Sequence, residues 1–332
     1  MSPIPYVDVD AAVLSPFLLR PLWLLIPSMP RSRKSTTIRL FASISNREAM
    51  NEFFQNNMVD LLKVTKQVLM VRESKEASSM HVDNLPDEAS IARARARMLD
   101  LAVLLLPGLD EEEINVLYSA IKHALQDEEG LMQKKAYKIL SLILMESEGF
   151  LPKRLDELLQ LIIMATSSCH FSAKRHRLDC LYFLIVHISK ETSPEQRMRE
   201  FVSAFLTEIL LSLKEANKKT RNKAYDLLVE IGRACGDEER GGRTEKLHQL
   251  FSMVAGGMVS ETPHMVSASI KGLARLAYEF SDLISAAYKL LPSSFLLLQR
   301  RNREIVKANL GLIKVLVAKS KTDGLETHLK GI

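Results

Sequence analysis

The feature that most constrains this chain is an apolar face of helical spacing that recurs along it. Three copies, beginning at Ala136, Ala224 and Ala308, have apolar or small residues at i, i+3, i+4 and i+7. That spacing places four side chains on one side of an α-helix. Comparable faces begin between them at Cys180 and Ile270, which halves the period to about 42–44 residues. A period of this length is typical of the helix pairs of HEAT and armadillo repeats.

Composition favours the same class of fold. Aromatic residues make up 6% of the 332 residues and there are only 13 Gly, and no alternating strand pattern of useful length appears. We therefore expect an all-α, HEAT/armadillo-like α-solenoid, a superhelix of five or six antiparallel helix pairs whose inner helices line a concave side. The expected outer helices are 110–126, 153–167, 195–214, 244–258 and 282–298.

Residues 1–45 differ from the rest of the chain. Six of the 12 prolines and the single tryptophan, Trp23, lie within the first 30 residues. The apolar run from Ala11 to Ile26 is interrupted by Arg20 and two prolines and is shorter than the roughly 20 residues of a spanning helix, so no membrane association is expected. The sequence predicts a disordered leader over 1–45. It predicts a HEAT-like repeat domain over 46–332, truncated at its C-terminus within another apolar stripe.

The sequence contains few residues that are arranged for catalysis or metal binding. The three cysteines include no C-x-x-C pair, which is typical of a reducing compartment. Cys169-His170, His176 and Cys180 form one group of metal-type residues, but Cys180 shares an apolar face with Leu181, so we expect no metal. The phosphate-cradling and nucleophile motifs G-x-x-x-x-G-K-[ST], G-x-G-x-x-G and G-x-S-x-G do not occur. The sequence therefore predicts a protein that is not an enzyme, with no cofactor and no small-molecule substrate.

Clusters of positive charge at the starts of the inner helices are the candidate binding residues. Cations at a helix N-terminus oppose the macrodipole by about 0.3–1 kcal/mol each, so local helix stability does not explain them. Two interpretations remain open: a basic strip that binds phosphates or an acidic peptide, or solvated side chains that pair with acidic residues of neighbouring repeats. The candidates are Lys174, Arg175, Arg177, Lys218, Lys219, Arg221, Lys223, Arg300, Arg301 and Arg303.

Two further observations limit this prediction. The helix that starts at Pro263-His264-Met265 carries no Lys or Arg in its first residues, so it breaks the basic pattern. No RNA-recognition motif appears, and Tyr137, Tyr182 and Tyr225 sit beside apolar helix positions where core packing is expected. Any contact with RNA would therefore be to the backbone.

Several stretches resemble the ribosomal RNA-processing protein 12 family, most closely its plant members. These are 168–178, 216–225, 258–280 and 302–311, and the resemblance extends over about 41–332. It implies a HEAT-repeat protein of the nucleus and nucleolus. It also implies association with pre-rRNA and pre-ribosomal particles, and with assembly or nuclear transport factors.

The sequence and the resemblance together predict a non-catalytic scaffold in ribosome biogenesis. Such a scaffold would act in pre-rRNA processing and in the maturation or export of pre-ribosomal subunits, and would bind the pre-rRNA backbone or assembly factors through its basic inner-helix clusters. The alternative is a purely protein-binding HEAT adaptor of the nuclear transport or phosphatase-scaffold type. These two differ in the salt dependence of binding, because phosphate contacts steepen the fall of affinity with salt.

Overall fold

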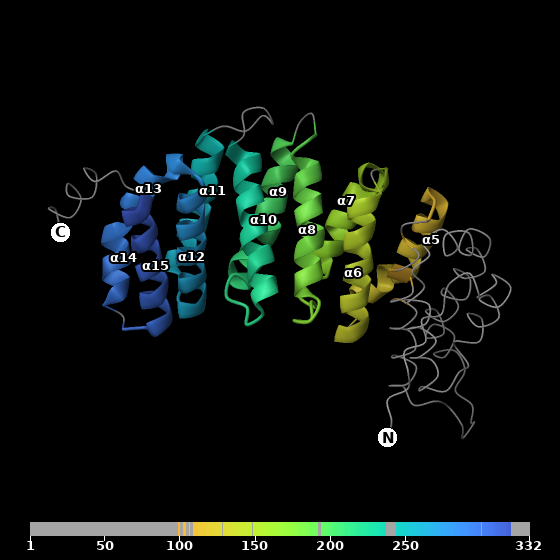
Figure 1. The fold of residues 1–332 in the computed structure, drawn as a ribbon, viewed down its shortest axis with the longest axis horizontal. Coiled ribbons are helices and arrows are strands. Elements are labelled where there is room, and N and C mark those ends of the chain that lie inside the picture. The colour runs from red at the N-terminus through yellow and green to blue at the C-terminus, as the bar shows by residue number, and fades with distance from the viewer. Residues whose placement is uncertain are drawn as a thin grey trace, which may run out of the picture. The chain divides into compact units, whose positions relative to one another are not determined.

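The computed structural model describes residues 109–127, 129–147, 149–191, 194–236, 244–299 and 301–319, together with Leu99, Ala102, Val103 and Leu106. Every regular element within these residues is an α-helix or a short 3-10 helix (Figure 1). The predicted leader 1–45 and the apolar stripe predicted near the C-terminus lie outside the described residues. The chain divides into two compact units, of which Leu155–Met164 and Lys174–Ile332 form the second.

The described part of the first unit holds an outer helix and an inner helix of the predicted repeat. Its elements are α5 (Glu111–Lys122), η4 (His123–Leu125), α6 (Gly130–Glu146) and the start of α7 (Phe150–Met164). A reciprocal capping box starts α5, since Glu113 N donates to Asp110 Oδ1 and Asp110 N donates to Glu113 Oε2. The predicted face that begins at Ala136 is completely buried in α6.

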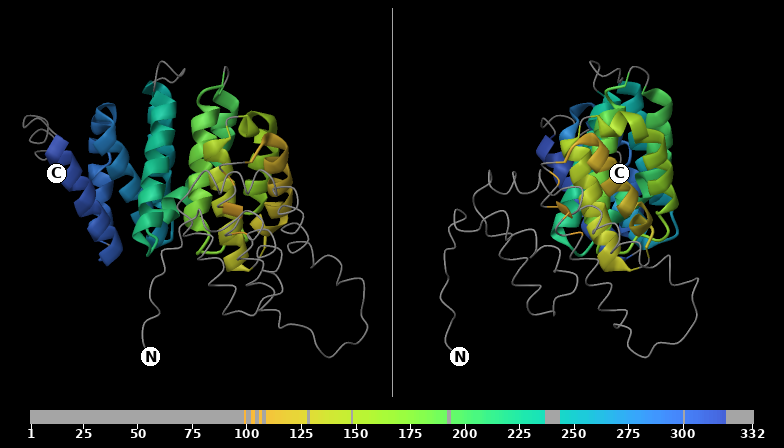
Figure 2. Two further views of the ribbon diagram at one scale, coloured as in Figure 1. Left: turned by 45° about the vertical axis from the view of Figure 1, so that its right-hand side comes forward. Right: turned by 90° about the vertical axis from the view of Figure 1, so that its right-hand side faces the viewer.

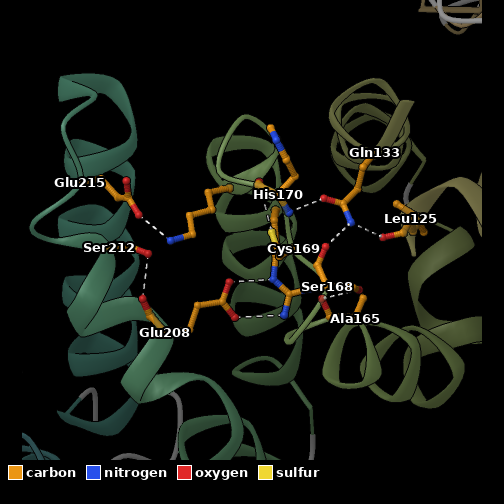
Figure 3. A network of polar contacts seen from close by, with 11 residues as sticks. Leu125, Gln133, Ala165, Ser168, Cys169, His170, Glu208, Ser212 and Glu215 are labelled. Atoms are coloured by element: carbon orange, nitrogen blue, oxygen red, sulfur yellow. Dashed lines mark hydrogen bonds and ion pairs between the residues drawn. The ribbon is translucent and has the colours of Figure 1, made fainter. Parts of the chain in front are cut away.

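A buried amide ties the loop after α7 to this unit. The Gln133 side chain on α6 has no exposed surface, and its Nε2 donates to the carbonyls of Leu125, at 3.3 Å, and Ser168, at 2.9 Å. Its Oε1 accepts from the backbone N–H of His170 at 2.6 Å (Figure 3). All three hydrogen bonds of the Gln133 side chain go to backbone groups, so its role is structural.

The second unit is a stack of helices in two layers. The helices are α8 (Lys174–Ile188), α9 (Glu195–Ser212), α10 (Lys218–Gly236), α11 (Thr244–Gly256), η6 (Gly257–Val259), α12 (Pro263–Glu279), η7 (Ser281–Leu283), α13 (Ile284–Tyr288), α14 (Leu291–Leu298) and α15 (Arg303–Lys319). In the inner layer α8 packs on α10, α10 on α12, and α12 on α15. The outer helices α9 and α11 pack against α10 and α12, and α13 and α14 pack against α15 (Figures 1 and 2). This nearest-neighbour packing confirms the predicted α-solenoid class.

The recurring apolar faces form the core of the stack. The faces that begin at Cys180 and Ala224 are buried completely, and each buried leucine contributes about 1.5–3 kcal/mol relative to an exposed one. In α15 the predicted face is rotated. Ala308 and Leu312 are buried as expected, but Gly311 is exposed, Val315 is half-buried, and Ile305 takes part in the core instead.

The prediction of one continuous helix over 282–298 was wrong. The segment consists of η7, α13 and α14, with a turn at Lys289 and Leu290. Pro292 is in the first turn of α14, where its missing N–H leaves no carbonyl unpaired, whereas inside a continuous helix it would remove a hydrogen bond and clash with the preceding turn.

Gly272 lets α12 pack tightly against three other helices of the second unit. A Cβ atom at this position would lie 2.8 Å from Leu210 Cδ2 of α9, 3.2 Å from Val254 Cγ1 of α11 and 3.4 Å from Leu228 Cδ2 of α10. The glycine costs helix propensity, about 1 kcal/mol relative to alanine, and allows the close approach in return. Within the described part of the chain, no helix combines the length and apolar character needed to cross a bilayer.

Candidate partner-binding surface

The basic cluster at the start of α8 is largely engaged with α9 and the turn that follows it. Lys174 Nζ lies 2.5 Å from Glu215 Oε1, and both side chains are partly exposed. Arg177 forms a two-pronged ion pair with Glu208, with Nε–Oε1 at 2.7 Å and Nη2–Oε2 at 3.0 Å (Figure 3). The cations at this helix start therefore join the inner helix α8 to the outer helix of the next repeat, α9, and to the turn after it.

Arg177 is not accessible to an external ligand. Its relative exposure is 0%, and its guanidinium carbon lies 5.9 Å from the centre of the Phe205 ring. A buried arginine of this kind needs its carboxylate, because an uncompensated buried charge is strongly destabilising. Arg177, one of the predicted binding residues, therefore lies in the packed interior, where it pairs with Glu208.

The cluster at the start of α10 divides into exposed and engaged residues. Lys218 and Lys219 are exposed in the first turn. Arg221 Nη1 donates to the backbone carbonyls of Glu215 and Ala216, at 2.7 Å each, just beyond the C-terminus of α9. This geometry explains a cation at an unfavourable helix start, because in a helix hairpin the start of the second helix lies beside the carbonyl end of the first.

Lys223 pairs with the preceding inner helix. Its Nζ lies 2.9 Å from Asp179 Oδ1 on α8. Burial alone raises the pKa of Asp179, but hydrogen bonds from His176 and Lys223 outweigh it and lower the pKa below its ordinary value. The pair therefore links α8 to α10 within the inner layer.

The cluster before α15 is the most exposed of those described. Arg301 and Arg303 are exposed, while Arg300 lies outside the described residues. Arg301 has φ of 51°, the left-handed region that a non-glycine residue rarely adopts. Asn302 follows as a helix cap, with Oδ1 accepting from Glu304 N at 3.0 Å and Ile305 N at 3.3 Å.

A second group of cations comes from three repeats, and of its members the sequence analysis predicted only Arg221 as a binding residue. It comprises Lys214 after α9, Arg221 on α10, Lys271 on α12 and Lys307 on α15. The pKa of Lys271 is lowered first by burial and then by the charges of Lys214, Lys307 and Arg221. Glu304 Oε2 pairs with Lys214 and supplies the opposing charge, and its own pKa is lowered by that contact.

Tyrosines and further cations extend this group along α12. Arg275 lies 6.0 Å from the ring centre of Tyr225 on α10 and 5.9 Å from that of Tyr278 on α12. Lys319 Nζ of α15 lies 4.4 Å from the Tyr278 ring centre. Tyr225 is half-buried and Tyr278 is 48% exposed. Tyr137 is buried as expected, whereas Tyr225 is outside the core and borders this surface.

The Cys and His residues considered as metal ligands have other surroundings. Cys180 is buried in the core, where burial raises the pKa of its thiol well above the ordinary value. His170 Nδ1 lies 2.8 Å from Ser172 Oγ, and His176 Nδ1 lies 3.6 Å from Asp179 Oδ2. The described residues contain no group of three or more His, Cys, Asp or Glu side chains arranged to hold a metal ion.

A small pocket lies on another side of the second unit, between α9, α10 and α11. Pro194, Met198, Val202 and Leu250 give it an apolar lining, and Cys235 forms part of its wall. Burial raises the pKa of the Cys235 thiol to about 11, which makes it a poor nucleophile.

The stacked helix pairs define the chain as an all-α helical-repeat protein of the HEAT/armadillo class. Over 308 residues it is 32% identical to the RRP12-like protein of Homo sapiens, covering 91% of this chain and 21% of that protein. It is 33% identical over 256 residues to the RRP12-like protein of Gallus gallus, covering 75% and 19%. It is 26% identical over 305 residues to ribosomal RNA-processing protein 12 of Saccharomyces cerevisiae, covering 86% and 23%. The chain is a homologue of the ribosomal RNA-processing protein 12 family, which confirms the resemblance predicted from its sequence.

The chain spans about a fifth of the length of the curated relatives that it matches. No protein-family model matches it. Among solved structures it is similar to the karyopherin Kap121p bound to the SUMO protease Ulp1p, with a TM-score of 0.48 and 17% identity over 94% of this chain and 32% of that one. It is also similar to a computationally designed armadillo repeat protein, with a TM-score of 0.40 and 15% identity over 76% and 99%.

Proposed function

We propose that the chain is a non-catalytic helical-repeat scaffold that acts in ribosome biogenesis, in the nucleus and nucleolus. The observation that carries this proposal is the homology over most of the chain to proteins named for ribosomal RNA processing. A stack of helices with no assembled catalytic group among the described residues fits a protein that holds other molecules in place. Its partners would be pre-rRNA and pre-ribosomal particles, with assembly or nuclear transport factors.

Exposed cations at the inner-helix starts support contact with an RNA backbone. Lys218, Lys219, Arg301 and Arg303 are exposed at the starts of α10 and α15. Phosphates of RNA are bound by such side chains without regard to base sequence. These four residues, with the partly exposed Lys174 and Arg175, are the members of the predicted clusters best placed to meet pre-rRNA.

A second candidate is the purely protein-binding adaptor of the nuclear transport or phosphatase-scaffold type. Its support is that much of the positive charge is already paired within the chain, as in Lys174 with Glu215 and Lys223 with Asp179. A cation that is already paired with a carboxylate of the same chain attracts a phosphate less strongly. In this function the inner helices would recognise a protein segment and no nucleic acid.

Depletion with complementation tests the proposed function. Cells depleted of the protein should accumulate unprocessed pre-rRNA on Northern blots, and re-expression of the full chain should restore the normal pattern. A matched variant, Gly272→Asp, would place a charged side chain among Leu210, Val254 and Leu228 and should fail to restore it. Normal pre-rRNA processing after depletion, with the protein absent from pre-ribosomal fractions on a gradient, would contradict the proposal.

A further inference from the structure

The surface that combines positive charge with exposed aromatic rings is not at the helix starts. It lies along α10, α12 and α15 in the second unit, and we call it the α12 strip. Its members are Arg221, Tyr225, Lys271, Arg275, Tyr278, Lys307 and Lys319, whereas the side chain of Lys214 beside them is only 7% exposed and pairs with Glu304. We propose that the α12 strip binds single-stranded RNA, with the lysines and arginines on its phosphates and the tyrosines stacked on its bases.

The helical register of α12 supports a continuous strip. Lys271, Arg275 and Tyr278 have the spacing i, i+4, i+7, so they share one face of the helix. None of the three is among the buried residues of α12, although Ser267 and Ala268, one turn before Lys271 on the same side, are buried. Two partly exposed cations and one exposed ring therefore lie in a row along the C-terminal half of α12.

The charge of the strip is unfavourable for the folded chain alone. Five cations lie along it, and among the described residues the carboxylate partner of these five is Glu279, 2.8 Å from Arg275. Partial burial first, and then the charges of Lys214, Lys307 and Arg221, lower the pKa of Lys271. An anionic ligand would relieve this repulsion, because each phosphate replaces a cation's lost hydration and offsets its neighbours.

The tyrosine rings of the α12 strip favour single-stranded RNA over an acidic peptide or a duplex. A basic groove with aromatic side chains is the general arrangement by which proteins hold single-stranded nucleic acid, since every base has a face that can stack. Tyr278 is about half exposed, and the cations of Arg275 and Lys319 lie 5.9 and 4.4 Å from the centre of its ring. An acidic peptide would use the cations but would gain little from the tyrosines, and a duplex hides its base faces.

This inference rests on the RNA-binding part of the proposed function, and binding measurements separate the two. The probes are a fluorescein-labelled 12-nucleotide oligouridylate and a 12-base-pair RNA duplex, titrated with the full chain at several salt concentrations. The test variants are Lys271→Gln/Lys307→Gln and Tyr278→Leu. The matched control is Lys246→Gln/Lys289→Gln, which removes two charges from α11 and from the turn before α14.

We expect the unmodified chain to prefer the single strand. The Lys271→Gln/Lys307→Gln variant should lower the slope of log affinity against log salt by about 1.4, because each phosphate that a lysine neutralises on a single strand contributes about 0.7. The Tyr278→Leu variant should weaken binding about tenfold with the slope unchanged, and Tyr278→Phe should keep full affinity because it retains the ring. The control should behave as the unmodified chain does.

Three results would overturn the inference. Equal slopes in the strip variant and the control, with oligouridylate still bound, would place RNA elsewhere and leave the proposed function standing. Equal binding of the duplex, with no effect of Tyr278→Leu, would refute the single-strand assignment. No RNA binding by the unmodified chain at low salt, with tight binding of a labelled 12-residue polyglutamate, would overturn both and favour the protein adaptor. Thermal melting of each variant shows whether it is folded, and removal of the repelled Lys271 charge should not lower its melting temperature.

Discussion

Removing Arg177 tests the distinction between a cation that binds a partner and a cation that holds the repeat together. In the Arg177→Ala variant, Glu208 loses both of its guanidinium hydrogen bonds, at 2.7 and 3.0 Å. Its carboxylate, only 11% exposed, is left without that partner. Two charge-assisted hydrogen bonds are worth about 1.5–3 kcal/mol each, and breaking a buried pair from one side costs about 3–5 kcal/mol. We expect a loss of stability of that size.

Urea unfolding followed by circular dichroism measures the loss. With a denaturant slope of about 2 kcal/mol/M, the midpoint should fall by about 1.5–2.5 M. The double variant Arg177→Met/Glu208→Leu should recover most of the stability, because it replaces both charges by apolar groups of similar size. An exposed matched control, Lys219→Ala, should shift stability by no more than about 0.5 kcal/mol.

The same variants separate stability from binding. The double variant Arg177→Met/Glu208→Leu should bind RNA with unchanged affinity and salt slope, because Arg177 has no exposed surface. A stability change below about 1 kcal/mol in Arg177→Ala would refute the reasoning from burial. So would a loss of RNA affinity in the folded double variant.

Three further predictions follow from contacts in the second unit. Gly272→Ala should destabilise the chain by about 1–3 kcal/mol in urea unfolding, because overpacking against Leu210 and Val254 exceeds the gain in helix propensity; unchanged or increased stability would contradict this. Since the folded-state pKa of Asp179 is lowered, its contribution to stability is present above the ordinary value of 3.8 and is lost as pH falls through the folded-state value. Asp179→Asn should therefore flatten the acid side of the stability curve below about pH 4, and an unaltered acid limb would count against the His176 and Lys223 contacts. Cys235, with a pKa raised to about 11, should react with iodoacetamide at about pH 8 far more slowly than the unfolded chain does, as mass spectrometry of the alkylated peptide would show, and equal rates would argue against its burial.

Much of the fold is predictable from the sequence because each helix buries its own periodic face. The faces that begin at Ala136, Cys180 and Ala224 are in the core as predicted, since a spacing of i, i+3 or i+4 specifies one side of one helix. The rotation of α15 and the break between α13 and α14 were not predictable in this way. They depend on which neighbouring helix covers a given residue and on the tertiary packing around Pro292.

The candidate site was predicted less completely, for a physical reason. Helix-start clusters are visible in the sequence because their cations are adjacent, but the sequence does not show that Arg177 faces Glu208, 31 residues away. The α12 strip brings together residues from three repeats, from Arg221 to Lys319, and its members are scattered singly along the chain. One signal was available: Lys271, Arg275 and Tyr278 share a helical face opposite the apolar one.

Ultraviolet crosslinking in cells, with sequencing of the bound RNA and mass spectrometry of the crosslinked peptides, tests the central claim most directly. The account predicts pre-rRNA as the main crosslinked RNA, and crosslinked peptides from α10, α12 and α15 that include Tyr225 or Tyr278. Recovery of the protein with assembly or transport factors but with no crosslinked pre-rRNA would contradict it.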